Sequence, residues 1–185
     1  MVYDIATIQY IYGANNNYQT GNDVYTFSQQ EPFFKTIWDA GGIDEISVAN
    51  FTNGCVIDLI PGTYSSIKID PPKDSGGVIP TYDGTSNLGI AFDCYIENAT
   101  GGSGADVLLG NELGNILNGR TGNDSITGGD GNDIICGGDG NDTLIGGNGA
   151  DNFFFDSPPN SLTNEDIITD FTTTSDRISL LETVF

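Results

Sequence analysis

A large apolar side chain recurs at every ninth position between residues 108 and 153, and polar or small residues fill most of the intervals. Neighbouring side chains of a strand point to opposite faces, so this spacing predicts a short strand with one inward residue, followed by a turn. Six such units run without a gap over residues 101–154, and two units would close one 18-residue coil. The inward positions are Leu108, Leu117, Ile126, Ile135, Leu144 and Phe153.

The segments that precede the repeats are also short and apolar. They are rich in β-branched and aromatic residues and are separated by Gly, Pro, Asn and Asp, a pattern typical of an all-β domain. By contrast, the apolar spacing of residues 2–12, followed by Gly13, predicts a short helix with Ile5, Ile8 and Tyr12 on one face. We expect strands at 25–27, 33–38, 43–48, 55–60, 66–69, 89–92 and 95–98, and a long surface loop at 70–88.

Glycine and aspartate occupy fixed places in the repeats. Glycine at the first, second and fourth positions permits positive φ and leaves carbonyl oxygens accessible, and five of the six units carry Asp at the sixth position. Calcium binds about six to eight oxygen ligands at about 2.3–2.6 Å, which carbonyls and carboxylates can supply. If two units close one coil, the turns of units n and n + 2 stack about 4.8 Å apart, so calcium can lie between them.

A flexible linker rich in Gly, Asn and Asp is the alternative interpretation of the repeats. A linker has no reason to carry an apolar residue at every ninth position six times over, so the pattern favours a folded array. The array resembles the G-G-x-G-x-D-x-U-x repeats of RTX proteins, where U is a large aliphatic residue. The sequence therefore predicts an all-β fold with a right-handed parallel β-roll built from calcium-binding nonapeptides.

The RTX resemblance implies how each calcium ion would be held between two turns on one edge. One turn gives the carbonyls of its second and fourth positions with its aspartate, and the next gives those of its first and third positions with its aspartate. Four internal sites follow: Gly102, Gly104 and Asp106 with Gly119, Thr121 and Asp124; Arg120, Gly122 and Asp124 with Gly137, Asp139 and Asp142; Gly129, Gly131 and Asp133 with Gly146, Asn148 and Asp151; and Asn111, Leu113 and Asn115 with Gly128, Asp130 and Asp133.

The last of these four sites departs from the repeat pattern. Leu113 stands where the pattern has glycine, and Asn115 stands where it has a carboxylate. The site therefore loses backbone freedom and one negative charge together. We expect calcium to be weakest or absent there.

Composition limits the classes of partner. The chain has 26 acidic residues, 5 basic residues and no histidine, which gives a formal net charge of -21 at pH 7. Electrostatic repulsion makes nucleic acid and anionic membrane surfaces unfavourable partners. Stacked aspartates should also repel one another, so we expect the repeats to fold when calcium binds.

The cysteines and the N-terminus bear on the compartment. Cys55, Cys94 and Cys136 are too widely spaced for a disulfide-rich scaffold. Two interpretations stay open, either three small buried residues with free thiols or a Cys55–Cys94 bridge. The chain has no apolar run of 18 residues, and its N-terminus lacks the pattern of a Sec signal peptide. Export, if it occurs, is expected by another route.

Nearly the whole chain is similar to the C-terminal part of the serralysins, secreted zinc metalloproteases whose catalytic domain precedes an RTX β-roll. Four segments carry the resemblance in this order: YDIATIQYIYGANNNYQTGNDVYTF, IWDAGGIDEISVANF, IDLIPGTYSSI and IENATGGSGAD. It implies a helix over 1–14 from the end of the protease domain or a linker, and a β-sandwich-like part over 15–100. The β-roll at 101–154 and a truncated capping segment at 155–185 would follow.

The chain itself is expected to be non-catalytic and to bind no zinc. The family's zinc motif, H-E-x-x-H-x-x-G-x-x-H, needs three histidines, and this sequence has none. Either a protease domain precedes this chain in its parent protein, or the natural protein is a relative without one. The expected partners are calcium ions, an N-terminal protease domain and the type I secretion apparatus, with no nucleic acid and no membrane insertion.

The serralysin resemblance also implies calcium sites on both sides of the repeats. A tight turn before the repeats and solvated loop carboxylates after them are the alternative interpretations. The first implied site joins Gln19, Gly21 and Asp23 to Asp39, Gly41 and Asp44, and the second uses Gly42 and Asp44 with Tyr95 and Glu97. After the repeats, Asp166, Asp170 and Asp176 are candidates to complete a fifth repeat site with Gly138, Gly140 and Asp142.

These patterns favour one function over two others. The leading hypothesis is a calcium-binding, non-catalytic C-terminal domain of a serralysin-like metalloendopeptidase that folds on extracellular calcium after secretion. The alternative is a stand-alone RTX interaction or adhesion module, or a repeat module of a secreted polysaccharide-modifying enzyme. Peptide hydrolysis by this chain alone is disfavoured because the zinc motif cannot form.

Overall fold

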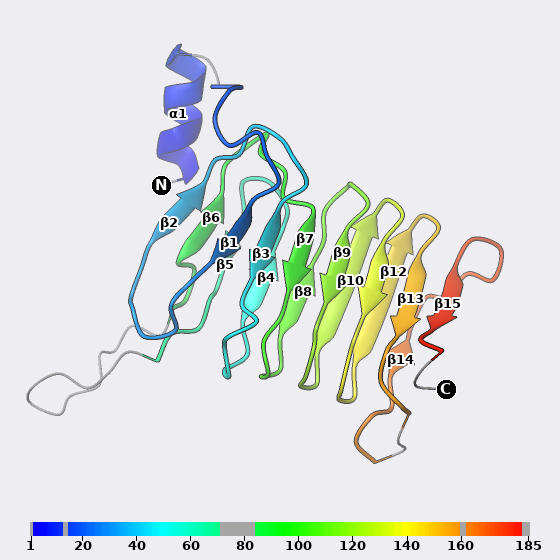
Figure 1. Cartoon of the computed structure of the whole chain (residues 1–185). Coiled ribbons are helices and arrows are strands. Elements are labelled where there is room, and N and C mark those ends of the chain that lie inside the picture. The colour runs from blue at the N-terminus through cyan, green and yellow to red at the C-terminus, as the bar shows by residue number, and fades with distance from the viewer. Residues whose placement is uncertain (1, 13–14, 71–83, 160–161, 183–185) are drawn as a thin grey trace, which may run out of the picture.

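The computed structural model describes residues 2–12, 15–70, 84–159 and 162–182, which form a stack of parallel coils. Figure 1 shows the strands following one another from the helix at the N-terminal end to the last strand at the other. The helix α1 spans Val2–Tyr12 as the sequence predicts, with Val2 buried and Ile5 packed against the core. The side chains of Ile8 and Tyr12, and most of the loop predicted at 70–88, lie outside the described residues.

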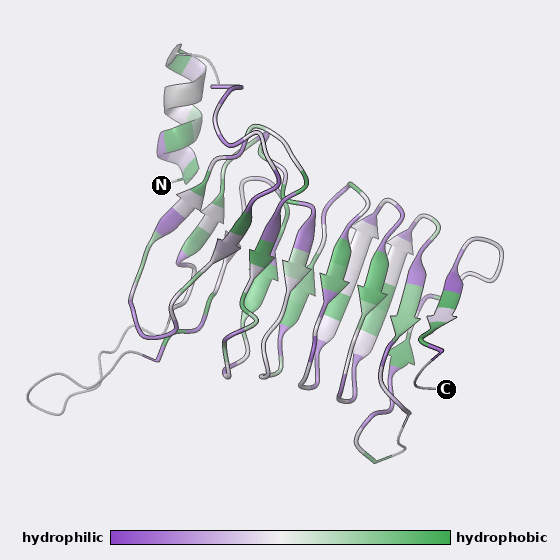
Figure 2. Cartoon of the chain, viewed as in Figure 1, coloured by the Kyte–Doolittle hydropathy of each residue, from purple (hydrophilic) through white to green (hydrophobic). Residues whose placement is uncertain are grey.

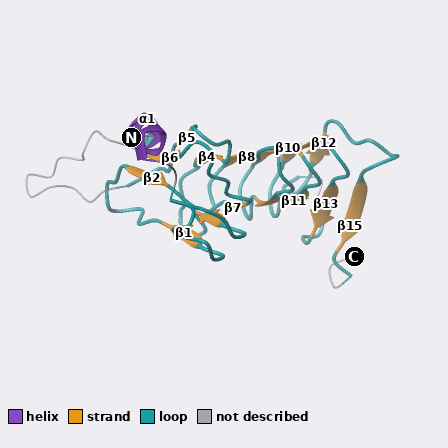
Figure 3. Ribbon diagram, turned by 90° about the horizontal axis from the view of Figure 1, so that it is seen from above, coloured by secondary structure: helices purple, strands orange, loops and turns teal. Residues whose placement is uncertain are grey.

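The described strands form three sheets, and the two larger ones are parallel throughout. Seen from above in Figure 3, the two larger sheets make two facing rows. The seven-stranded sheet contains, in order, β1 (Val24–Thr26), β3 (Glu45–Ser47), β7 (Asn98–Thr100), β9 (Ile116–Asn118), β11 (Ile134–Cys136), β13 (Asn152–Phe155) and β15 (Arg177–Leu180). The five-stranded sheet contains β14 (Ile167–Ile168), β12 (Thr143–Asn148), β10 (Ser125–Asp130), β8 (Val107–Leu109) and β4 (Val56–Asp58). The small sheet contains β2 (Lys35–Ile37), β6 (Leu88–Ile90) and β5 (Tyr64–Ser65), and its β5–β6 pair is antiparallel.

The register within the repeats confirms a coil of two nonapeptides. In the five-stranded sheet, Val107 pairs with Ser125, and Ser125 pairs with Thr143. Each partner is 18 residues further along the chain, so consecutive units alternate between the two sheets. Units n and n + 2 therefore stack directly, as the predicted calcium sites require.

The apolar residue at the eighth position of each unit forms the core of the roll. All six of these side chains are at most 1% exposed. Most of their neighbours along the strand face outward, as Ile116 does with 50% of its surface exposed, although Cys136 beside Ile135 is buried. Figure 2 shows the same division, with apolar residues concentrated in the strands and hydrophilic residues in the turns. Burying one such aliphatic side chain contributes roughly 1.5–3 kcal/mol, so the column is a main source of stability.

The predicted N-terminal β part is continuous with the roll. β1, β3 and β7 join the seven-stranded sheet, and β4 joins the five-stranded sheet, so both large sheets extend across residue 100. The core also changes along the stack. Around β4 and β6 it contains several fully buried side chains per coil, whereas each repeat unit adds one. The denser part contains Phe51, Ile57, Leu59, Ile67, Leu88, Ile90 and Ile96.

Two predicted strands are misplaced. The strand expected at 66–69 is β5 at Tyr64–Ser65, extended by a single antiparallel bridge between Val56 and Ser66. The Asn87 side chain bonds both the N–H and the carbonyl of Ile67 at 2.9 Å, so a side chain replaces the strand partner there. The strand expected at 95–98 is β7, which begins only at Asn98.

All three cysteines are free and buried. The alternative of a Cys55–Cys94 disulfide is therefore wrong, and the interpretation as small buried residues is confirmed. Burial raises the pKa of the Cys55 and Cys94 thiols to about 11, which keeps them protonated at neutral pH.

Candidate metal centre

Acidic residues form two ladders along the stack, one at the start of each large sheet's strands. Each ladder residue immediately precedes a strand, and at every step but one a side-chain oxygen of one residue accepts the backbone N–H of the residue before it in the stack. At the exception, Asn115 Nδ2 donates to the carbonyl of Glu97 at 2.8 Å. The five-strand ladder consists of Asp106, Asp124, Asp142 and Asp166, joined at 2.7, 2.7 and 3.0 Å. The seven-strand ladder consists of Asp23, Asp44, Glu97, Asn115, Asp133, Asp151 and Asp176. Its hydrogen bonds from a backbone N–H to a side-chain oxygen measure 2.7 Å for Asp23–Asp44, 2.8 Å for Asp44–Glu97, 2.8 Å for Asn115–Asp133, 3.0 Å for Asp133–Asp151 and 3.2 Å for Asp151–Asp176.

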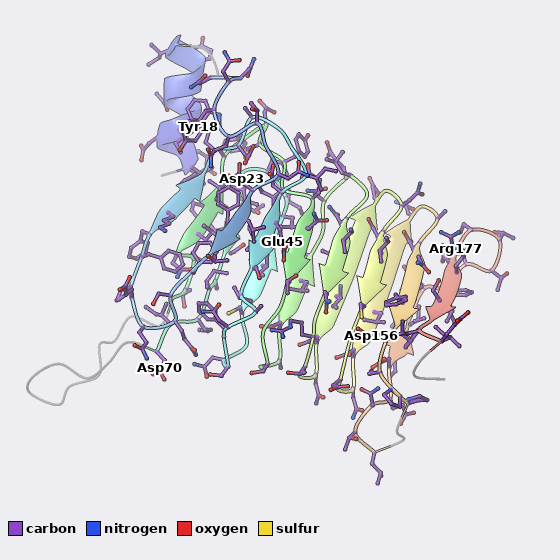
Figure 4. All side chains as sticks on the ribbon, in the orientation of Figure 1. Tyr18, Asp23, Glu45, Asp70, Asp156 and Arg177 are labelled. Carbon is purple, nitrogen blue, oxygen red and sulfur yellow. The ribbon has the colours of Figure 1, made fainter. Side chains whose placement is uncertain are left out.

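The seven-strand ladder runs the length of the molecule. In Figure 4, Asp23 lies beside the first strands of the sheet, and Arg177, which directly follows Asp176, lies beside β15 at the other end. The two ladder bonds at these ends join Asp23 to Asp44 and Asp151 to Asp176. Aspartates far apart in the sequence are therefore brought into one row by the stacking of coils.

The ladder bonds use only one oxygen of each aspartate. The other oxygen, Oδ2, is buried and has no hydrogen-bond partner among the described residues in five of them: Asp44, Asp124, Asp133, Asp142 and Asp151. A buried carboxylate oxygen without a partner is costly, and it is stable only if a cation or a proton satisfies it. These residues fit a hard cation such as calcium, whose ligands are oxygens.

Burial disfavours the charged form of these carboxylates. It raises the pKa of Asp124 to about 7 and those of Asp44, Asp133 and Asp142 to about 6, and neighbouring carboxylates add to the effect. The pKa values of Asp106, Asp151 and Asp166 are raised for the same first reason. The raised pKa values of these seven carboxyl groups indicate a shortage of positive charge around them.

Glycine at the first position of a unit makes room for these oxygens. A Cβ placed on Gly119 would meet Asp124 Oδ2 and would lie 2.7 Å from the carbonyl oxygen of Gly137. The same holds at Gly128, where Asp133 Oδ2 and the carbonyl of Gly146 would be in the way. An aspartate oxygen and a carbonyl of the next turn therefore converge where only glycine leaves space.

The structure brings together the turns that the sequence pairs. Carbonyl oxygens at the second position accept the N–H at the third position of the turn stacked on them. These bonds join Asn111 to Asp130 at 3.1 Å, Arg120 to Asp139 at 2.8 Å and Gly102 to Thr121 at 3.4 Å, while β10 and β12 pair Gly129 with Gly147 and Asp130 with Asn148. All four predicted sets of turns are thus adjacent.

The first site implied before the repeats also converges. Carboxylate oxygens of Asp23, Asp39 and Asp44 lie within 4.8 Å of one another. The Tyr25 hydroxyl donates to Asp39 at 2.5 Å, and Gln19 accepts the N–H of Ala40 through its carbonyl at 3.0 Å. Gly41 of this set has a φ of 139°, and the carbonyl of Gly21 packs directly against Gly42 of the second implied site, whose φ is 145°.

The second implied site shares Asp44. The backbone N–H of Asp44 donates to Oε2 of Glu97 at 2.8 Å, which places Glu97 in the seven-strand ladder. The Tyr95 hydroxyl points elsewhere and donates to Glu112 at 2.7 Å. A pocket of about 600 Å³ lined in part by Asp39 and Glu97 opens beside this cluster and gives access to the carboxylates.

The three aspartates expected to complete a fifth repeat site are separated in the structure. Asp166 accepts the N–H of Asp142 at 3.0 Å and so continues the five-strand ladder beside one member of the expected set. Asp176 instead accepts the N–H of Asp151 at 3.2 Å, on the other edge. Asp170 accepts the N–H groups of Gly146 and Gly147 at 3.0 and 2.8 Å. The chain changes sheets between β14 and β15, so the three cannot converge with Gly138, Gly140 and Asp142.

Sequence reasoning missed the contribution of asparagine to these turns. At the fifth position, the side chain of Asn123 accepts the N–H of Asn141 at 2.9 Å, and that of Asn132 accepts the N–H of Ala150 at 2.8 Å. Asn164 accepts the N–H of Gly140 at 2.6 Å in the last turn. The recurring G-N-D sequence of units 3 to 5 is the signal that could have identified this second set of links.

Stacked parallel coils with buried carboxylates on both edges define a β-solenoid domain of the β-roll class. The chain belongs to the Peptidase M10 serralysin C-terminal family, whose model matches residues 2–184. The predicted membership and the predicted all-β, parallel solenoid fold are both confirmed.

The curated relatives of this chain are serralysin-type proteases. The chain is 37% identical over 129 residues to "Serralysin" of Proteus mirabilis, an alignment that covers 63% of this chain and 23% of that protein. It is 39% identical over 126 residues to "Metalloprotease AprA" of Pseudomonas entomophila, with 62% and 23% covered. The chain thus spans about a quarter of the length of these relatives and corresponds to their C-terminal part. Among the described residues, the single helix is too short to cross a membrane.

Proposed function

We propose that this chain is the calcium-binding, non-catalytic C-terminal domain of a serralysin-like secreted metalloendopeptidase. The observation that supports it best is the set of five buried aspartate oxygens without a hydrogen-bond partner in the described structure. Calcium would neutralise the carboxylates that line each edge and accept their free lone pairs. The residues that would hold it are those predicted from the sequence in the turns that carry a ladder carboxylate, together with Asp176 beside Asp151.

The protein's own part is to present oxygens in a fixed row. The ladder bonds orient each aspartate through Oδ1, and the glycine at the first position lets Oδ2 approach the carbonyl of the next turn. Because the row is assembled only when coils stack, the affinity for calcium and the folding of the roll are one process. We expect each ion to bind in the range of extracellular modules, roughly 10⁻⁴ to 10⁻³ M, with cooperativity from shared aspartates.

This coupling suits a domain that leaves the cell before it folds. Type I secretion and an extracellular location are part of the proposal, as are an N-terminal zinc protease domain and the secretion apparatus as partners. At low calcium the repelling ladders would keep the roll open, and at extracellular calcium they would close it.

Circular dichroism and calorimetry on the whole chain test the proposal. Calcium added to a chelated sample should restore parallel β-structure and release binding heat, while magnesium at the same concentration should do neither, since it demands a smaller octahedral site. β-Structure retained in full after exhaustive chelation would contradict the coupling. A calorimetric trace without binding heat, together with no ion retained on dialysis, would contradict calcium binding itself.

A further inference from the structure

The first two repeat units differ from the following four in backbone conformation. In units 3 to 6 the residue at the second position has a positive φ, between 73° at Arg120 and 113° at Gly129. Gly102 and Asn111, which hold that position in units 1 and 2, do not have a positive φ. The fourth position shows the same division, since Gly122, Gly131, Gly140 and Gly149 have positive φ and Gly104 and Leu113 do not.

This difference decides where the N–H of the second position points. In unit 1 it donates to the ladder side chain of its own turn, from Gly102 to Asp106 Oδ2 at 2.6 Å. In unit 2 it does the same, from Asn111 to Asn115 Oδ1 at 2.8 Å. The ladder oxygen of these two turns is therefore capped within the turn. The equivalent oxygens of units 3 to 6 are buried without a partner in the described structure: Asp124, Asp133, Asp142 and Asp151.

Unit 2 goes further and satisfies its whole turn with amide groups. Asn115 donates through Nδ2 to the carbonyl of Glu97 at 2.8 Å and to Asn111 Oδ1 at 3.2 Å. Asn111 in turn donates to the carbonyls of Leu59 at 3.3 Å and Ile96 at 2.9 Å. Both side chains are almost fully buried, with Asn111 5% exposed and Asn115 1% exposed. The amide groups thus satisfy one another, the neighbouring carbonyls and the N–H of Asn111, so the polar groups of this turn have partners without a cation.

The core is also densest beside these two units. The coils that carry β4, β6 and β7 contribute several fully buried apolar side chains each, whereas every unit from the third onward contributes one at its eighth position. Apolar burial scales with the area removed from water, so the neighbourhood of units 1 and 2 is stabilised more strongly per coil. This part of the stack lies between Asp44 on one side and Asp124 on the other. Each of these aspartates has a buried Oδ2 without a hydrogen-bond partner in the described structure.

We propose that the strands β4, β6, β7, β8 and β9 form a calcium-independent centre, and that units 3 to 6 become ordered on it only with the cation bound. The inference rests on the proposed function, because it assigns the calcium requirement to part of the ladders. The coil containing Asp23, Asp39 and Asp44 is the second calcium-requiring flank. A preformed centre offers a template for strand pairing, so the flanking coils do not have to nucleate separately.

Hydrogen exchange of the whole chain, read by mass spectrometry with EDTA and with saturating calcium, tests the inference. Amides of β7, β8 and β9 should exchange slowly in both conditions, and those of β10 to β13 should be protected only in calcium, by on the order of tenfold or more. Fast exchange of β8 and β9 in EDTA, with calcium restoring all strands, would overturn the centre and leave the proposed function intact. Equal protection of all strands in both conditions would instead overturn the proposed function.

Two asparagine variants make the test specific. Asn115→Asp replaces the amide donors with a carboxylate facing the carbonyl of Glu97, so β9 should lose its protection in EDTA and regain it in calcium. Asn111→Asp, which removes the donors to Leu59 and Ile96, should act in the same direction. The matched control is Asn17→Asp, which makes the same charge change at an exposed position outside both ladders and should leave the exchange of β9 unchanged. Unchanged exchange of β9 in both Asn115→Asp and Asn111→Asp would count against the amide network.

Discussion

The backbone N–H of Asp124 donates to Oδ1 of Asp142 at 2.7 Å, across 18 residues of sequence. That bond follows the register in which β10 and β12 pair, and the second oxygen of Asp142 is buried without a partner in the described structure, where positive charge is needed. Structure and binding are therefore carried by two atoms of the same side chain, and they can be separated by substitution.

Asp142→Asn should weaken calcium binding while keeping the coil register. The amide retains an acceptor for the N–H of Asp124 but removes a charge and places a donor where Oδ2 lies. We expect the calcium midpoint measured by circular dichroism to rise about tenfold, or about 1.4 kcal/mol. Glu31→Gln makes the same charge change at an exposed residue outside the ladders and should leave the midpoint in place. Equal midpoints for the two variants would remove Asp142 from the site.

Acid should affect the chain in opposite directions with and without calcium. The raised pKa values of Asp124, at about 7, and of Asp44, Asp133 and Asp142, at about 6, mean that protonation favours the folded state when no cation is present. This stabilisation is complete below the unfolded pKa of about 4 and is lost as pH rises through 6 to 7. Asp176, whose pKa is lowered by the N–H of Thr172, opposes the trend only slightly because it lies at the surface.

The measurement is β-structure followed from pH 8 to pH 5. In the calcium-free chain, ellipticity should approach its folded value as the pH falls. In the presence of calcium, the midpoint concentration should rise over the same interval, since bound carboxylates must lose their protons. A calcium-free chain that unfolds further on acidification would contradict the burial of these carboxylates.

The column at the eighth position should dominate stability once calcium is bound. Leu117→Ala removes a fully buried side chain and should lower the free energy of unfolding by roughly 2–5 kcal/mol. Ile116→Ala, at the neighbouring position on β9, changes a half-exposed side chain and should cost much less. Urea unfolding in saturating calcium measures both. Similar losses for the two variants would contradict the alternation of inward and outward residues.

Gly137→Ala tests the space that the first position of a unit leaves open. Gly137 does not have a positive φ, so alanine suits its backbone, but the added Cβ would meet Oδ2 of Asp142 and lie 2.8 Å from its Cγ. We expect a loss of about 1–3 kcal/mol in unfolding free energy and a higher calcium midpoint. Gly21→Ala is the matched control for the unfolding free energy, because a Cβ there meets nothing within 4 Å and alanine keeps the carbonyl that the first implied site would use. A neutral Gly137→Ala would show that the turn can open without cost.

Periodicity predicted the regular parts of this molecule because one physical rule repeats in them. The ninefold spacing of apolar residues led directly to the 18-residue coil, and the glycine positions led to the turns that stack. The irregular parts depend on single side chains that no period reveals. Asn87 replaces a strand partner for Ile67, and a change of sheet sends Asp176 to Asp151.

Asn115, which replaces the aspartate of the repeat pattern, is a second case that periodicity alone does not resolve. The missing carboxylate predicts a weak site, but the sequence does not show what fills the turn. The amide network with Asn111 depends on carbonyls from the coil before it, at Ile96 and Glu97, and on Leu59 from the other sheet. Contacts of this kind are set by tertiary packing, so only the structure identifies them.

The alternation of units between two sheets has a consequence for how the ions influence one another. Each ladder joins only units of one parity, so Asp133 is bonded to Asp151 and Asn115, but not to Asp124 or Asp142. The roll therefore behaves as two interleaved one-dimensional arrays of sites that share one hydrophobic core. In double-mutant cycles, Asp133 should couple energetically to Asp151 and be nearly additive with Asp142, although Asp142 is the nearer of the two in sequence.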